Sequence, residues 1–266
     1  MSSEVVITEI DHKGIARVIL NRPSVHNAFD DSLVYNLNKE LCELDRSDDV
    51  RVIILSGNGK SFCAGADLKW MQRMINASKE ENRDDAIALA LLLVNIWSLS
   101  KPTVSLVHGS AFGGGVGLIA ATDIAICTEG TIFAISEARV GLIPSTISPF
   151  VINAIGESHA KRYFLTGEKF NATKALDIGL VHEVVPEGNL KLKSEQIVES
   201  LIKCGPNAQR EAKRLFGVPR ELLRDPNLSA EITNDLAERI AELRVSVEGQ
   251  EGIKAFLEKR KPSWSI

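Results

Sequence analysis

The sequence predicts an α/β fold followed by a helical extension, and three observations support this fold class. Runs of β-branched residues alternate with segments whose leucines recur at helical spacing. Two similar units, each a strand that leads through a turn into small residues and a helix, occur in the first half of the chain. No strand pattern follows Gly205-Pro206, so we expect an α/β core over residues 1–205 and a helical region over residues 206–266.

The composition of the 266-residue chain fits one large domain, or a core with a small appendage. Apolar residues make up 44% and charged residues 25%, a balance that excludes disordered and collagen-like proteins. The formal charge of −4 argues against a surface that coats nucleic acid. The apolar stretch 87–99 is too short to span a bilayer, and residues 1–4 lack signal-peptide features. We therefore expect a cytoplasmic protein with no membrane partner.

The chain begins with a predicted β-hairpin and a helix. Residues 5–10 and 15–20 are β-branched runs, and Asp11-His12-Lys13-Gly14 between them is a hairpin signal. Behind Asp30 and Asp31, which can cap a helix start, four leucines recur at helical spacing: Leu33, Leu37, Leu41 and Leu44. The next strand, residues 51–55, is apolar nearly throughout, as expected when both faces are covered.

A weak internal repeat places small residues at two predicted helix starts. Residues 52–57 lead into Ala64-Gly65-Ala66, and residues 103–109 lead into Gly113-Gly114-Gly115. Each arrangement exposes backbone N–H groups at a helix start. Two such groups suit a thioester carbonyl that becomes an enolate, because charge develops on its oxygen. Small residues are required because a side chain would block the close approach of the acyl group.

Two helices are predicted in the tail. A long helix carries an apolar stripe formed by Leu228, Ile232, Leu236, Ile240 and Leu243. The last helix carries Ile253, Phe256 and Leu257 and stops before Pro262. A stripe of this width fits either core or a subunit interface, and we expect core.

Two nucleotide-binding patterns are incomplete, and no metal site is predicted. Residues 58–61 resemble the end of a P-loop, but Ile54 stands where that pattern needs glycine. Residues 115–120 match a dinucleotide fingerprint, yet residues 109–112 separate them from the preceding strand. The cysteines lie far apart, and we expect them to be reduced core residues: Cys42, Cys63, Cys127 and Cys204.

Residues 56–68 and 108–118 resemble the two signature segments of the crotonase (enoyl-CoA hydratase/isomerase) superfamily. The likeness extends from Leu20-Asn-Arg-Pro23 to residues 256–261. This resemblance implies a ClpP/crotonase-like spiral of ββα units with a C-terminal helical extension that takes part in trimerisation. It also implies an acyl-CoA substrate, no cofactor beyond the CoA of that substrate, and a homotrimer or a hexamer.

The resemblance assigns roles to individual residues. It implies that the N–H groups of Ala66 and Gly114 hold the thioester oxygen and that Glu137 is the catalytic acid/base. An apolar pocket would raise the pKa of this glutamate and so favour proton exchange with carbon. The resemblance further implies contacts with substrate or CoA, the last two from a neighbouring subunit, at Ala64, Asp67, Leu68, Lys69, Gly117, Phe256 and Lys259.

Other interpretations stand beside these assignments. Asp67 fits a helix cap better than a catalytic acid. Lys69 also fits a solvated helix lysine. His26 and His108 flank the signature segments and fit hydrogen-bonded structural histidines. Arg22 fits either a turn or the rim of a CoA site.

Two departures from the family pattern bear on the reaction. Hydratases of the family usually carry a second glutamate where this chain has Gly117, and its absence favours an isomerase, which needs only one acid/base. Residues 145–150 replace a usual glycine-rich run, and together with Gly117 they resemble bacterial hydratases of the methylglutaconyl-CoA type, which serve leucine or acyclic-terpene breakdown. Arg139 could pair with a substrate carboxylate, although a surface ion pair is favoured.

We therefore expect an enoyl-CoA hydratase, which is a hydro-lyase that adds water to a 2-enoyl-CoA. We expect it to serve fatty acid or leucine metabolism, and its candidate substrates include branched and 3-methylglutaconyl thioesters. The first alternative is a Δ3,Δ2-enoyl-CoA isomerase that uses the single glutamate. The second is a non-catalytic CoA- or RNA-associated member of the family. The acidic composition and the absence of a Lys/Arg stripe disfavour a nucleic-acid partner.

Overall fold

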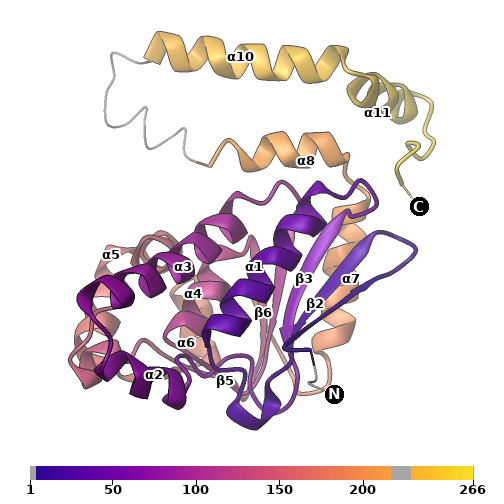
Figure 1. Cartoon of the computed structure of the whole chain (residues 1–266). Coiled ribbons are helices and arrows are strands. Elements are labelled where there is room, and N and C mark those ends of the chain that lie inside the picture. The colour runs from indigo at the N-terminus through magenta and orange to yellow at the C-terminus, as the bar shows by residue number, and fades with distance from the viewer. Residues whose placement is uncertain (1–3, 217–228, 266) are drawn as a thin grey trace. The chain divides into compact units, whose positions relative to one another are not determined.

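The computed structural model describes residues 4–216 and 229–265 (Figure 1). Contacts divide the chain into two units. Unit 1 comprises residues up to 99 together with 103–196, and unit 2 comprises residues 100–102 and 197–266. The division falls inside helix α7 (Leu190–Ile202), whereas the sequence analysis places the boundary at residue 205.

Unit 1 contains a six-stranded sheet whose strands follow the order β1-β2-β3-β4-β6-β9. Its members are β1 (Val6–Ile10), β2 (Ile15–Leu20), β3 (Val52–Gly57), β4 (Thr103–Val107), β6 (Ile124–Thr128) and β9 (Glu183–Val185). Strands β1 and β2 form the predicted antiparallel hairpin, and the remaining neighbours pair in parallel. The hairpin turn is held by Asp11, whose Oδ1 accepts hydrogen bonds from the N–H groups of Lys13 and Ile15.

A second, three-stranded sheet has the order β5-β7-β8. Its members are β5 (Ser110–Phe112), β7 (Ile132–Ala134) and β8 (Lys169–Asn171). Strand β5 lies between the end of β4 and helix α4 (Gly114–Ala121), so it carries the chain from the larger sheet into the second small-residue helix start. The parallel pairing of β5 with β7 holds the entrance of α4 next to the end of β7.

The other helices of unit 1 are α1 (Asp31–Arg46), α2 (Leu68–Ile75), α3 (Lys79–Ser98), α5 (Ser148–Thr166), α6 (Ala172–Asp177) and the short 3-10 helices η1 (Pro23–Val25) and η2 (Glu137–Val140). Helix α1 confirms the predicted leucine pattern, since Leu33, Leu37, Leu41 and Leu44 are buried. Asp30 caps this helix by accepting a hydrogen bond from Leu33 N–H.

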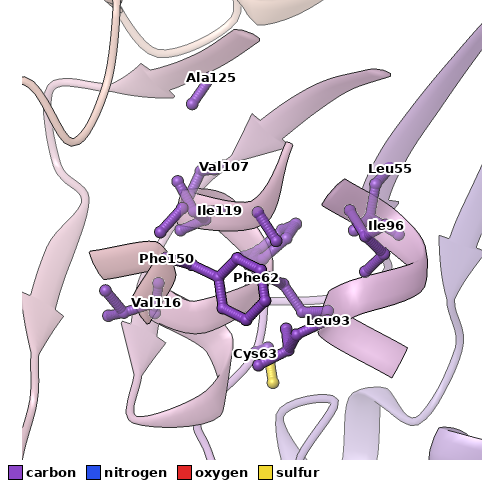
Figure 2. Close-up of a cluster of buried hydrophobic side chains, with 14 of the residues drawn as sticks. Leu55, Phe62, Cys63, Leu93, Ile96, Val107, Val116, Ile119, Ala125 and Phe150 are labelled. Atoms are coloured by element: carbon purple, nitrogen blue, oxygen red, sulfur yellow. The ribbon is translucent and has the colours of Figure 1, made fainter. Parts of the chain in front are cut away.

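The core of unit 1 lies between the larger sheet and its helices. Figure 2 shows side chains that come from different elements and meet there: Leu55 of β3, Val107 of β4, Ala125 of β6, Leu93 and Ile96 of α3, Val116 and Ile119 of α4, and Phe150 of α5. Helix α4 is buried along nearly its whole length, as expected for a helix that is apolar on all sides. Its first turn is therefore held rigidly against the strand ends.

Unit 2 contains α8 (Pro206–Lys213), α10 (Ser229–Val245) and α11 (Val247–Leu257), and its described residues form no strand, as predicted. Glu248 of α11 accepts hydrogen bonds from the N–H groups of Asn207 and Ala208, and so it occupies the N-terminus of α8. Helix α11 ends before Pro262, in agreement with the predicted last helix.

The apolar stripe of α10 does not form ordinary core within one chain, so that prediction is wrong. Ile240 is 47% exposed, and Ile232, Leu236 and Leu243 are half-buried. Leu228, the first member of the stripe, lies outside the described residues. Helical periodicity identifies which face of the helix is apolar, but it does not specify what covers that face.

The expectation that all four cysteines are core residues is also wrong in part. Cys63 and Cys127 are buried, Cys42 is half-buried, and Cys204, in the turn after α7, is exposed. Over residues 4–216 and 229–265, no three His, Cys, Asp or Glu side chains gather in an arrangement able to hold a metal ion. No helix in those ranges has both the length and the hydrophobicity needed to cross a membrane.

We expect Leu37→Ala to lower the free energy of unfolding by about 2–5 kcal/mol, because it deletes a fully buried side chain and leaves a cavity. Urea unfolding followed by circular dichroism measures the change. The matched control is Leu165→Ala, at an exposed position of α5, which should leave the unfolding midpoint nearly unchanged. Equal losses in the two variants would contradict the position of the core.

Candidate active site

Two short segments of unit 1 lie side by side through backbone hydrogen bonds. The N–H group of Cys63 donates to Ser110 O at 3.1 Å, and the N–H group of Phe112 donates to Cys63 O at 3.0 Å. These bonds bring residues 63–66, which precede α2, against residues 110–115, which open α4. The two helix starts that the sequence singles out are therefore neighbours in space.

Glycine makes this close approach possible. A Cβ atom at Gly115 would lie 2.4 Å from the carbonyl oxygen of Cys63, so no side chain fits there. Gly65 has φ +90° and Gly113 has φ +50°, which is a backbone region that other residues rarely adopt. The glycines of both segments are thus required by the backbone and by the contact between the segments.

Phe29 contacts both helix starts. Its N–H donates to Gly65 O at 2.7 Å, and its carbonyl accepts from Asp67 N–H at 2.9 Å, so that it forms a parallel bridge with Ala66. On the other side, Cε2 of its ring lies 2.7 Å from where a Cβ atom at Gly114 would stand. One buried residue thereby sets the positions of Ala66 and Gly114.

The N–H groups of Ala66 and Gly114 have no acceptor among the described residues. The carbonyl of Gly65 and the N–H of Ala66 belong to one planar trans peptide, so the bond from Phe29 to that carbonyl directs the N–H away from Phe29. Gly114 is the first residue of α4 and has no partner within the helix. Free amides at a helix N-terminus favour a negatively charged oxygen.

Glu137 places a carboxyl group beside this helix start. It is the first residue of η2, and its Oε1 lies 3.1 Å from where a Cβ atom at Gly113 would stand. Its Oε2 is buried and has no hydrogen-bond partner among the described residues. Burial raises the pKa of Glu137, and a hydrogen bond from its own backbone N–H opposes this effect only partly. The side chain is therefore suited to hold and release a proton.

The space beside Gly117 is filled by another side chain. A Cβ atom at this position would lie 2.4 Å from Cγ2 of Ile147 and 3.3 Å from Cδ1 of Leu93. Ile147 is buried at the start of α5, within the segment that departs from the family pattern. A carboxylate at position 117 would therefore have to displace the packed Ile147.

The structure confirms that Asp67 is a helix cap, at the start of α2. Its Oδ1 accepts hydrogen bonds from Lys69 N–H at 2.8 Å and from Trp70 N–H at 3.4 Å, and its Oδ2 lies 2.9 Å from Arg22 Nη2. Of the neighbouring residues assigned to substrate or CoA, Leu68 and Lys69 are exposed and Ala64 is half-buried.

The two tail residues assigned to CoA, Phe256 and Lys259, belong to unit 2. Phe256 is 82% exposed, and Lys259 has a positive φ of 55° just after the end of α11. Their contact with CoA stays a prediction.

The flanking histidines make the hydrogen bonds expected of structural residues. His26 Nδ1 lies 3.0 Å from Ser61 Oγ, and His108 Nε2 lies 2.9 Å from Gly59 O. Burial raises the pKa of the Cys63 thiol to about 12, so this cysteine stays protonated and is a poor nucleophile.

The surface ion pair favoured for Arg139 does not form within the described part of the chain. Arg139 is exposed on η2, two residues after Glu137, and its Cγ lies 3.0 Å from where a Cβ atom at Gly167 would stand. The neighbouring carboxylate of Glu168 instead pairs with Arg162, at 2.6 Å.

Sequence reasoning missed three residues that shape the site: Phe29, Asn27 and Ile147. Asn27 is fully buried, its Oδ1 accepts from Arg22 N–H, and its Nδ2 donates to the carbonyl oxygens of Asn58 and Ser61. The one available signal was the position of Asn27 and Phe29 in an irregular stretch that precedes a capped helix. That stretch has no periodicity from which to infer partners 30 or more residues away.

Comparison with known proteins identifies a family. The enoyl-CoA hydratase/isomerase family matches residues 11–265 of the chain. Hydroxycinnamoyl-CoA hydratase-lyase of Pseudomonas fluorescens is 33% identical over 219 residues, which cover 80% of this chain and 79% of that protein. The human mitochondrial enoyl-CoA hydratase domain-containing protein 3 is 30% identical over 256 residues, which cover 95% of this chain and 81% of that protein.

Solved structures with related sequences share the fold. An enoyl-CoA hydratase from Shewanella pealeana is 38% identical, with a TM-score of 0.90 over 98% of this chain and 96% of that one. Pseudomonas aeruginosa AtuE is 34% identical, with a TM-score of 0.92 over 99% of this chain and 100% of that one. The predicted crotonase fold with a C-terminal helical region is confirmed.

The raised pKa of Glu137 predicts a pH-dependent difference between the wild type and Glu137→Gln. The stability contributed by the protonated acid is present below its unfolded-state pKa and is lost as the pH rises through its folded-state pKa. Across that window we expect the wild type to lose stability relative to the glutamine variant. Urea unfolding of both proteins at several pH values measures this difference, and parallel stability profiles would contradict it.

The packing at Gly117 predicts that Gly117→Ala lowers the free energy of unfolding by about 1–3 kcal/mol through overpacking. The double variant Gly117→Ala/Ile147→Ala should lose less than the sum of the two single changes, since shortening Ile147 makes room for the added methyl group. A double-mutant cycle from thermal or urea unfolding measures the coupling, and strictly additive losses would refute the contact.

Proposed function

Because the chain belongs to the enoyl-CoA hydratase/isomerase family, we propose that it is a hydro-lyase that adds water across the double bond of a 2-enoyl-CoA thioester. The observation that carries this proposal is a pair of amides, at Ala66 and Gly114, that have no acceptor among the described residues, beside the Glu137 carboxyl group, whose Oε2 has no hydrogen-bond partner there. The amides suit an oxygen that becomes negative, and the carboxyl group suits proton transfer to the adjacent carbon.

In this proposal the two amides act on the thioester oxygen. Both N–H groups donate hydrogen bonds to it, and these bonds strengthen as the enolate forms. The N-terminus of α4 adds a partial positive charge in the same place. Loss of one such donor typically costs about 10²–10³ in rate.

Glu137 moves the proton. As the oxygen of water bonds to Cβ, the π-electron pair of the double bond moves toward the thioester oxygen and forms the enolate. The carboxylate accepts a proton from the water and returns one to Cα, where the electron pair of the enolate forms the new C–H bond. The raised pKa of this group brings its protonated and ionised forms closer in free energy near neutral pH, which favours both transfers.

The proposal extends to substrate and assembly. We take branched acyl groups, including 3-methylglutaconyl, as substrates, because Gly117 and residues 145–150 depart from the usual family pattern. Arg139, exposed two residues after Glu137, could bind a carboxylate at the end of such a group. CoA arrives with the substrate, and no other cofactor is used. The enzyme works in the cytoplasm as a trimer or hexamer. In this assembly Phe256 and Lys259 contact the CoA of a neighbouring subunit.

One observation favours a second candidate, a Δ3,Δ2-enoyl-CoA isomerase. Moving a double bond requires only that one group remove a proton and return it elsewhere, whereas hydration also requires that water be held. Ile147 fills the space beside Gly117, so no carboxylate from this position can help to hold water. Glu137 alone suffices for the isomerase reaction.

We expect purified protein to hydrate crotonyl-CoA or 3-methylglutaconyl-CoA, seen as loss of the conjugated thioester absorbance, and Glu137→Gln to lower kcat by about 10²–10⁴. The matched control is Glu129→Gln, in an exposed turn after β6, which should keep wild-type kinetics. Isomerisation of a 3-enoyl-CoA without hydration would favour the second candidate. Full activity of Glu137→Gln would exclude the proposed mechanism.

A further inference from the structure

One guanidinium group joins the chain segments on either side of Phe29 and Ala66. Arg22 Nη2 lies 2.7 Å from Asp30 Oδ2 and 2.9 Å from Asp67 Oδ2, and Arg22 Nη1 donates to the carbonyl oxygen of Ala28. The side chains of Arg22, Asp30 and Asp67 are only 17%, 24% and 6% exposed. The ion pairs are therefore shielded from solvent far more than ordinary surface pairs.

Each of the two carboxylates serves two partners. Asp30 uses Oδ1 to cap α1 through Leu33 N–H, and Asp67 uses Oδ1 to cap α2 through Lys69 N–H. Their Oδ2 atoms both face Arg22. Arg22 thus ties the starts of two helices to each other, which neither cap does alone.

The same guanidinium is connected to the Ala66 amide through the neighbouring residue Asp67. The peptide that carries this N–H follows Gly65, whose φ of +90° and lack of a side chain leave the peptide free to rotate unless its neighbours hold it. It is held on one side by the bond from Phe29 N–H to Gly65 O and on the other by Asp67. Arg22 links Asp67 to the residues on both sides of Phe29.

We propose that Arg22 is a positioning residue that keeps the N–H of Ala66 aimed at the thioester oxygen. This inference rests on the proposed function, since it assumes that the amide stabilises charge on that oxygen. Two carboxylates and one carbonyl need a planar group with several donors in a fixed fork, which arginine has and lysine lacks. The role is distinct from a turn or a CoA rim, the two interpretations that the sequence left open.

The state of Asp67 agrees with such a link. Burial raises the pKa of its carboxyl group, but hydrogen bonds from Lys69 N–H, Trp70 N–H and Arg22, together with the charge of Arg22, outweigh burial and lower it. Asp67 therefore stays ionised and bound to Arg22 throughout the neutral pH range.

The test compares Arg22→Lys with the matched control Arg17→Lys. Arg17 also pairs with an aspartate of unit 1, Asp11 at 3.2 Å, but it lies on the hairpin strand β2, outside the active-site segments. We expect Arg22→Lys to lower kcat by about 10–10² with little change in KM, because a misplaced donor weakens mainly the transition state. Arg17→Lys should keep wild-type kinetics.

A spectroscopic readout separates positioning from stability. With a thioester analogue labelled at the carbonyl carbon, infrared difference spectra should show the carbonyl stretch lowered by binding to the wild type and partly restored toward its free value in Arg22→Lys. A variant that loses only thermal stability, with unchanged kcat and carbonyl frequency, would overturn the inference. A wild type that binds the thioester without shifting its carbonyl stretch would instead overturn the proposed function itself, and this inference with it.

A second pair of variants keeps the test decisive if Arg22→Lys folds poorly. Asp67→Asn and Asp30→Asn each remove one charge facing Arg22, and asparagine preserves both helix caps. We expect the larger loss of kcat for Asp67→Asn, since Asp67 is bonded covalently to Ala66. Equal losses, or a larger loss for Asp30→Asn, would contradict the inference.

Discussion

The active-site architecture depends on one close contact between backbones. Cys63 exchanges hydrogen bonds with the strand β5, and this pairing leaves no room for a side chain at Gly115. Glycine in regular structure costs conformational entropy, roughly 0.5–1 kcal/mol per position relative to alanine. The buried core around α4 compensates for this cost and holds the contact in place. The two free amides are the consequence, because each stands where its own segment has no acceptor to offer.

Two opposing electrostatic influences meet at Glu137. The nearby N-terminus of α4 favours a negative charge, while burial of Oε2, which has no hydrogen-bond partner within the described part of the chain, disfavours one. The pKa of Glu137 is raised, so burial is the larger influence. The two amides and the Glu137 carboxyl group therefore have different roles. The amides are available for a negatively charged oxygen of a ligand, and the acid retains its proton more readily than an exposed glutamate would.

The parts of this structure that the sequence predicts are those determined by local patterns. The β-hairpin, the capped leucine helix α1 and the two small-residue helix starts all follow from spacing within about 15 residues. The resemblance to the crotonase family pointed to Ala66, Gly114 and Glu137, but not to the residues that hold them. Phe29 and Arg22 also act on partners 36 to 85 residues away, through contacts that no periodicity encodes. The α10 stripe and Cys204 show the complementary error, in which apolar character was taken for burial.

The interlocked pair at Gly117 and Ile147 also constrains how sequences like this one can change. While isoleucine occupies position 147, any side chain introduced at 117 meets a filled space, so a substitution at that position alone costs stability. A smaller residue at 147 must come first, and it leaves a void until the second substitution follows. Positions 117 and 147 are therefore coupled, and a side chain at 117 is accommodated only together with a smaller residue at 147.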